Sequence, residues 1–143
     1  MFENLSKTIE SISKIEVSDE RKEVLKPLVE YIQNKVNLNE EIRLNFICTH
    51  NSRRSHLSHI WAQTMAFQFG IKNVFCYSGG TEATAMFPKV GETLVNQGFQ
   101  IQKLSEEQNP VSRLSLMIIN ILSSVFQKPI SMILIRKLTL EPS

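Results

Sequence analysis

The segment Leu44-Asn-Phe-Ile-Cys48 is followed directly by Thr49-His-Asn-Ser-Arg-Arg-Ser55. Its first five residues form a short, apolar and β-prone run, which predicts a buried strand that ends on the cysteine. After Ser55, which is placed to cap a helix, apolar residues recur at helical spacing until Gly70: Leu57, Ile60, Trp61, Met65 and Phe69. The sequence therefore predicts a strand, a polar loop and a helix, with a cysteine at the start of the loop.

The polar loop has a pattern suited to holding a tetrahedral oxyanion. Its successive backbone N–H groups can curl around an anion, and the positive end of the helix dipole points at the same place. The same field, with the guanidinium of Arg54, lowers the pKa of a thiol, so we expect Cys48 to be a nucleophilic thiolate near neutral pH. Arg54 is expected to bind two oxygens of the anion, Ser55 to donate its hydroxyl to the sulfur, and Asn51 to hold the loop in shape. The alternative is a purely structural role, in which Cys48 is a buried, unreactive side chain and Arg54 is a surface cation.

Further strands and helices follow the loop and its helix. The run from Asn73 to Ser78 predicts a second strand, closed by Gly79-Gly80. Pro88 suits the first turn of another helix, Lys89 to Gln97, which Gly98 ends, and Phe99 to Leu104 predicts a third strand. Strands that alternate with helices are typical of a parallel sheet with right-handed crossovers. The predicted fold class is α/β, with residues 41–110 as the first part of the domain.

Residues 1–40 show helical periodicity twice. Apolar residues recur at three- and four-residue steps, which predicts two amphipathic helices: Phe2, Leu5, Ile9, Ile12 and Ile15, then Leu25, Leu28, Val29, Ile32 and Val36. Ser18 or Asp19 is placed to cap the second helix, and Pro27 is expected to kink it or to mark its first turn. We interpret this part as an N-terminal helical hairpin that packs on the domain.

Residues 111–143 differ in composition from the rest. They hold one acidic residue, Glu141, and the run from Leu114 to Phe126 is almost entirely aliphatic, Ser or Asn. That run is shorter than the ~20 residues that span a bilayer, which argues against a membrane segment. One hypothesis is a shift of the reading frame near Asn109-Pro110, which would make this tail foreign to the domain.

Composition excludes several classes of protein. The 16 basic and 14 acidic residues leave a formal net charge of +2, which does not favour nucleic acid as a partner. The two cysteines, Cys48 and Cys76, lack metal-ligand spacing, so we expect no metal, cofactor or disulfide scaffold. The N-terminus lacks the pattern of a secretory signal. We therefore predict a cytoplasmic protein, where thiols stay reduced.

The segments Cys48-Thr-His-Asn-Ser-Arg-Arg-Ser55 and Tyr77-Ser-Gly-Gly-Thr-Glu-Ala83 resemble the low-molecular-weight protein tyrosine phosphatase superfamily, which includes thioredoxin-coupled arsenate reductases. The resemblance implies a hydrolase or reductase that acts on phosphate, a phosphotyrosine-like group or arsenate. It makes Cys48 the nucleophile and Arg54 the oxyanion clamp, with Asn51 and Ser55 as loop organisers. By the same resemblance the loop amides come from Thr49, His50, Ser52 and Arg53.

The chain also departs from that family's pattern. His50 stands where glycine is usual, and Arg53 stands where a second cysteine is frequent; Arg53 would attract anionic substrates or simply lie in solvent. A phosphatase of this family uses an Asp-Pro pair as proton donor, but Asp19 is the chain's single aspartate. An arsenate reductase needs two further cysteines, and Cys76 is expected in the core. Three functions thus remain open: a phosphatase, a thioredoxin-coupled arsenate reductase, and an inactive oxyanion-binding or partner-binding module. Association of the apolar tail with a membrane is a weaker alternative.

Overall fold

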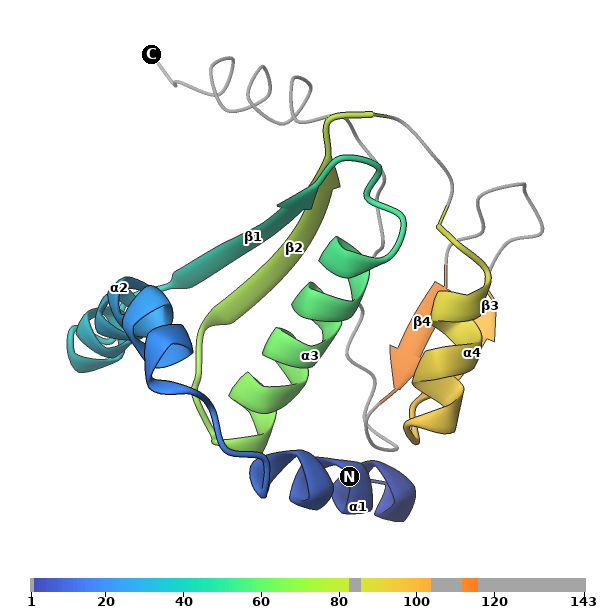
Figure 1. Cartoon of the computed structure of the whole chain (residues 1–143), viewed down its shortest axis with the longest axis horizontal. Helices are drawn as coiled ribbons and strands as arrows, with labels where there is room; N and C mark the ends of the chain where they lie inside the picture. Colours follow the sequence, from blue (N-terminus) through green and yellow to red (C-terminus); the bar gives the residue numbers. More distant parts are fainter. Residues whose placement is uncertain (1, 83–85, 104–111, 116–143) are drawn as a thin grey trace.

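The computed structural model describes residues 2–82, 86–103 and 112–115. Its elements follow one another around a central helix, α3 (Figure 1). In chain order they are α1 (Glu3–Ser13), α2 (Asp19–Asn37), β1 (Ile42–Cys48), α3 (Arg54–Gln68), β2 (Val74–Gly80), α4 (Lys89–Asn96), β3 (Gln100–Lys103) and β4 (Ser112–Ser115). The predicted α/β class is confirmed.

Strands β1 and β2 lie side by side and parallel, with α3 as the connection between them (Figure 1). The register pairs Ile42 with Val74 and Cys48 with Gly80, so both strands end at the same level. Alternate residues of β1 are buried or half-buried on the face toward α3, while Arg43, Asn45 and Ile47 are exposed on the other face. The loop that carries the cysteine therefore starts at the carboxyl end of a parallel pair, as the sequence predicts.

The third predicted strand forms, but it does not join β1 and β2. Strand β3 pairs antiparallel with β4, in a separate two-stranded sheet, with Gln100 opposite Ser115. An antiparallel partner can follow after a short connection, whereas a parallel one needs a long crossover, so the nearby segment 112–115 is the easier partner. Our expectation of one parallel sheet with three strands is thus wrong for β3.

The apolar core lies on the side of α3 that faces away from the sheet. It joins residues of α1, α3, α4 and the start of the β3 segment: Leu5, Ile9, Ile60, Val90, Leu94 and Phe99. Trp61 packs edge-on against Phe99, with ring centroids 5.3 Å apart, and its indole N–H donates to Oε1 of Gln97 at 3.1 Å. Gly98 has a φ of +98°, and a Cβ there would lie 2.4 Å from the backbone nitrogen of Leu5, so glycine permits α1 to approach.

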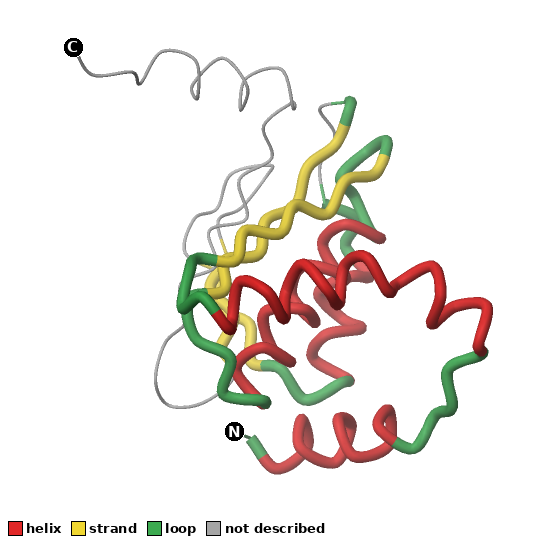
Figure 2. Tube along the Cα trace, turned by 90° about the vertical axis from the view of Figure 1, so that its left-hand side faces the viewer, coloured by secondary structure: helices red, strands yellow, loops and turns green. Residues whose placement is uncertain are grey.

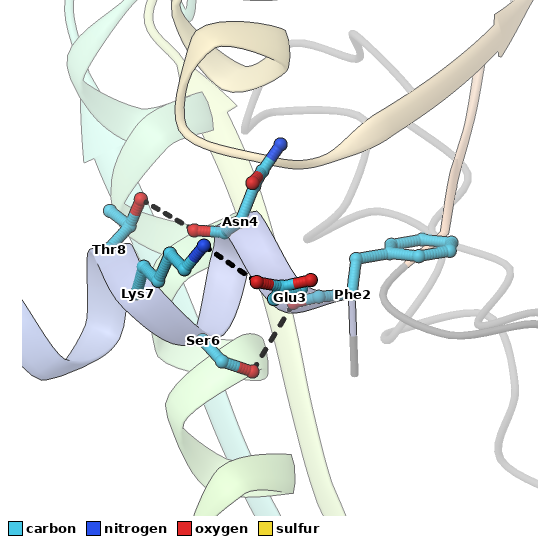
Figure 3. Close-up of polar contacts among 6 residues, drawn as sticks. All are labelled: Phe2, Glu3, Asn4, Ser6, Lys7 and Thr8. Atoms are coloured by element: carbon cyan, nitrogen blue, oxygen red, sulfur yellow. Dashed lines mark hydrogen bonds and ion pairs between the residues drawn. The ribbon is translucent and has the colours of Figure 1, made fainter.

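Helix α1 begins without a side-chain cap and is fixed mainly by burial. Its first turns carry local contacts (Figure 3): Lys7 pairs with Glu3 at 2.6 Å, and the hydroxyl of Thr8 donates to the carbonyl of Asn4 at 3.1 Å. Such exposed contacts contribute little. Leu5 and Ile9 are buried, and the Thr8 hydroxyl also lies 3.0 Å from the carbonyl oxygen of Gln97, beyond the end of α4. Helix α1 is therefore part of the core.

Helix α2 is continuous from Asp19, with Pro27 inside it, so Pro27 does not mark its first turn. The predicted cap is Ser18, whose side chain accepts from the backbone N–H of Arg21 at 3.3 Å. None of its residues is buried, and Figures 1 and 2 show it standing apart from α1. The two predicted N-terminal helices are present, but only α1 packs on the domain core.

Helix α3 also completes the outer edge of β2. The amide of Gln63 donates to the carbonyl of Val74 and accepts from the N–H of Cys76, both at 3.0 Å. These two groups point away from β1, because Asn73 just before them bonds toward Ile42. One side chain thus pairs backbone groups that would otherwise face outward at the edge.

Most of the compositionally distinct tail lies outside the described residues. Only 112–115 of it are placed, as β4, so the frame-shift hypothesis stays a prediction. No helix within residues 2–82, 86–103 and 112–115 is long and apolar enough to cross a membrane.

Candidate active site

The loop between β1 and α3 brings three predicted site residues together. The sulfur of Cys48 lies 3.2 Å from the hydroxyl oxygen of Ser55, and that hydroxyl lies 2.7 Å from Oδ1 of Asn51. Asn51 and Ser55 are each 2% exposed, so no bulk water competes for these bonds. The structure therefore links the end of the strand, the middle of the loop and the first turn of the helix through side chains.

Backbone conformation explains the residue types in the loop. Asn51 has a φ of +43°, in the left-handed region that Asn tolerates better than most residues. Ser55 does not cap α3 as predicted: the helix begins at Arg54, its N-cap is Arg53, and no side chain caps it. Ser55 sits inside the first turn instead, where its hydroxyl is aimed at the loop interior.

The Cys48 thiol is more acidic than an ordinary cysteine. Partial burial raises its pKa, but hydrogen bonds from the Ser55 side chain and from the backbone N–H groups of Ser55, Ser52 and Asn51 outweigh that and lower the pKa from 9.0 to about 7. Three backbone donors thus converge at the sulfur, as expected for an anion-binding nest. The lowering comes from these hydrogen bonds, whereas the sequence led us to expect a contribution from the Arg54 guanidinium.

The Ser55 hydroxyl has one proton for two neighbours. When it donates to Asn51, the Cys48 thiol can donate to Ser55, and when Cys48 is a thiolate, the hydroxyl must turn to the sulfur. Loss of the thiol proton therefore rearranges the bond between Ser55 and Asn51.

The back of the loop is fastened to the end of β2. The carbonyl of Thr49 accepts from the backbone N–H groups of Thr81 and Glu82, both at 2.9 Å, and from the Thr81 hydroxyl at 3.2 Å. A Cβ on Gly80 would lie 2.7 Å from the Asn51 nitrogen and 2.9 Å from the Thr49 oxygen. Only glycine allows this close approach. From the sequence we interpreted Gly79-Gly80 as the end of a strand and did not predict this packing role.

In front of the loop lies a pocket of about 510 Å³, lined by Cys48, His50, Ser52, Arg53 and Arg54. The guanidinium of Arg53 lies over the ring of Phe87, 4.3 Å from its centroid, and the Phe87 N–H donates to the Ser52 carbonyl at 3.0 Å. Arg53 is thus an exposed cation with a fixed position rather than a freely solvated one. Arg54 is exposed in the same pocket.

His50 and Glu82 are in contact beside the pocket. Nε2 of His50 lies 3.1 Å from Oε2 of Glu82, and each side chain is more than half exposed. His50 belongs to the loop and Glu82 follows β2, so the pair connects the two segments that meet at Thr49.

Two histidines that the sequence analysis did not single out lie behind the loop. His56 and His59 on α3 are buried, with ring centroids 5.8 Å apart. Nδ1 of His56 lies 3.3 Å from the Ser78 hydroxyl, and burial, with His59 nearby, lowers the pKa of His56 to about 4 despite the Asn51 backbone, which raises it. Both histidines share the buried stripe of α3 with Ile60 and Thr64, a helical spacing that could have revealed them.

Comparison with known proteins gives one match that bears on this site. A family model described as low molecular weight phosphotyrosine protein phosphatase matches residues 43–124, more than half of the chain. The chain belongs to this family. No curated protein and no solved structure matched the chain. Family membership supports cysteine-based chemistry of the phosphatase or arsenate reductase type, on a phosphate-containing or similar oxyanion.

The phosphatase family match also runs past residue 110, into the segment that composition separates as a tail. Within the matched range, Cys76 lies on the same strand pair as Cys48 but four residues away, since it pairs with Leu44. Four residues of strand correspond to about 13 Å, well beyond the roughly 7 Å between Cα atoms that a disulfide allows. Burial also raises the pKa of Cys76 to about 11.

Proposed function

We propose that the protein hydrolyses phosphate monoesters of the phosphotyrosine type, with Cys48 as the nucleophile. The observation that carries this proposal is the surroundings of the Cys48 sulfur. Backbone N–H groups of Asn51 and Ser52 act on it, and the Ser55 hydroxyl lies 3.2 Å away. A donor set of this kind stabilises a thiolate first and a bound oxyanion in front of it next.

The reaction would proceed in two displacements. The Cys48 thiolate attacks phosphorus, an S–P bond forms, and the P–O bond to the alcohol or phenol breaks. Water then attacks phosphorus, the S–P bond breaks, and inorganic phosphate leaves. Arg54 binds the equatorial oxygens as charge develops, and Ser55 donates to the departing sulfur.

The remaining loop residues would hold the substrate through their backbone. In this proposal Thr49, His50, Asn51, Ser52 and Arg53 supply amides that surround the phosphate. Arg53, stacked on Phe87, adds a positive charge at the rim, which favours dianionic substrates.

We place hydrolysis before arsenate reduction because of the cysteine count. The chain has two cysteines, and Cys76 is too far along β2 to form a disulfide with Cys48 without movement of the strand. A reductase would therefore need an outside thiol to resolve the oxidised Cys48. Thioredoxin-coupled arsenate reduction, and anion binding without turnover, are outcomes that the same assay distinguishes.

The test is turnover of p-nitrophenyl phosphate by the purified chain, and in parallel arsenate reduction with thioredoxin. We expect hydrolysis that Cys48→Ser abolishes and that Cys76→Ser, a matched control at the second cysteine, leaves intact. Hydrolysis that survives Cys48→Ser would contradict the proposal. Arsenate reduction without hydrolysis would assign the reductase branch, and phosphate binding without either reaction would assign a binding module.

A further inference from the structure

Hydrolysis of esters with basic leaving groups needs a proton donor for the leaving oxygen, and the one aspartate in the sequence is Asp19. Asp19 begins α2, which adjoins the start of β1, while the loop follows the end of β1 (Figure 1). Asp19 also pairs with Lys22 at 2.8 Å on the exposed surface. The described structure thus places the single aspartate away from the pocket.

Among the described residues that line the pocket, one besides Cys48 has a side chain of the kind that can both give and take a proton near neutral pH. Of Cys48, His50, Ser52, Arg53 and Arg54, the first is the nucleophile, serine is a very weak acid, and the two arginines stay protonated. Histidine is the side chain that most often acts as general acid and base. The lining therefore points to His50.

The position of His50 suits that task. Its Nε2 lies 3.1 Å from Oε2 of Glu82, so a carboxylate is placed to orient the ring. The backbone on both sides is fixed, because the Thr49 carbonyl, directly before His50, accepts from the N–H of Glu82 at 2.9 Å. His50 lines the pocket, and both side chains are more than half exposed, so the imidazole is accessible to a substrate from solvent.

We propose that His50, oriented by Glu82, is the proton donor and acceptor of the hydrolysis. This inference rests on the proposed phosphatase function. As the P–O bond breaks, Nδ1 of the imidazolium gives its proton to the leaving oxygen, while Nε2–H stays directed at Glu82. In the second step Nδ1 takes a proton from the attacking water, so phosphate is released and the imidazolium is restored.

The test uses two substrates that differ in their need for a proton. p-Nitrophenolate leaves readily as an anion, whereas phenolate is much more basic and leaves well only when protonated. We expect His50→Asn to lower kcat/KM for phenyl phosphate by about 100-fold or more, and that for p-nitrophenyl phosphate by less than about tenfold. Glu82→Gln is expected to follow the same pattern with a smaller loss, about tenfold on phenyl phosphate.

A matched control removes a carboxylate from a surface ion pair elsewhere. Glu41→Gln breaks the exposed pair with Arg43 at the far end of β1 and is expected to change neither rate. Unfolding midpoints of all variants establish that they fold, which the exposure of His50 favours. Equal losses on both substrates, or no loss on either, would overturn the role of His50. No turnover of either substrate by the wild-type chain, or turnover independent of Cys48, would refute the phosphatase function itself.

Discussion

Removing the Ser55 hydroxyl should make Cys48 a weaker acid by a predictable amount. Ser55 is 2% exposed, so in Ser55→Ala no water replaces the hydroxyl at 3.2 Å from the sulfur. A hydrogen bond to a charged group contributes about 1.5–3 kcal/mol, and one pKa unit corresponds to about 1.4 kcal/mol. The pKa of Cys48 should therefore rise from about 7 by about one to two units, toward the ordinary 9.0.

The assay is the rate of alkylation by iodoacetamide as a function of pH, in a Cys76→Ser background so that one thiol reacts. At pH 7 the thiolate fraction should fall from about one half to between about 1% and 10%, and the alkylation rate with it. Ser58→Ala, an exposed serine one turn further along α3, is the control and should leave the profile in place. A Ser55→Ala profile that coincides with that of the wild type would refute the assignment of the low pKa to this hydroxyl.

Three further predictions concern the supports of the site. Gly80→Ala places a Cβ 2.7 Å from the Asn51 nitrogen and should lower Cys48-dependent turnover by about 100-fold, because the loop is displaced. Gly91→Ala is the control, since its Cβ would meet only Ile101 at 3.9 Å, and it should leave turnover unchanged. Equal rates for the two variants would show that the loop tolerates the shift. Gln63→Leu leaves the Val74 carbonyl and the Cys76 N–H without their partner, so the free energy of unfolding in urea should fall by about 1–3 kcal/mol. Gln68→Leu, at an exposed position of α3, is the control and should change it little. Similar losses in both variants would contradict the edge contact. His56 has a pKa lowered to about 4, so its contribution to stability is complete above 6.5 and is lost as pH falls toward 4, because the unfolded chain takes up a proton that the folded chain refuses. His56 alone should lower the free energy of unfolding by about 1.4 kcal/mol per pH unit in that window, and His59, whose pKa burial also lowers, adds to the loss. A His56→Asn variant with the full wild-type slope would contradict the assignment.

Local patterns were enough to predict the strand, the loop and helix α3. The apolar run up to Cys48 and the helical spacing up to Gly70 are short-range signals, and the structure places β1 and α3 there. The loop-shaping role expected of Asn51 also depends on one residue, and its φ of +43° lies in the left-handed region that Asn tolerates. Features set by neighbours along the chain were thus accessible from the sequence.

Features set by distant partners were not. The pairing of β3 with β4 depends on which strand is nearest in space, and the strand pattern alone did not distinguish the two sheets. Ser55 fits the composition of a helix cap, but the backbone angles at Arg53 begin the helix earlier and turn Ser55 toward the sulfur. The tight approach of Gly80 to the loop likewise appears only when β2 lies beside β1.

The three donors that hold the Thr49 carbonyl have a consequence for ligand affinity. They fix the conformation of the loop before any ligand binds. The entropic cost of ordering the loop backbone, about 1–2 kcal/mol per residue, is therefore already met when the chain folds. Small ligands gain most from such preorganisation, because none of their limited binding free energy is used to order the loop. Free inorganic phosphate should accordingly bind to the loop between β1 and α3 on its own, and it would then slow the proposed hydrolysis as it accumulates.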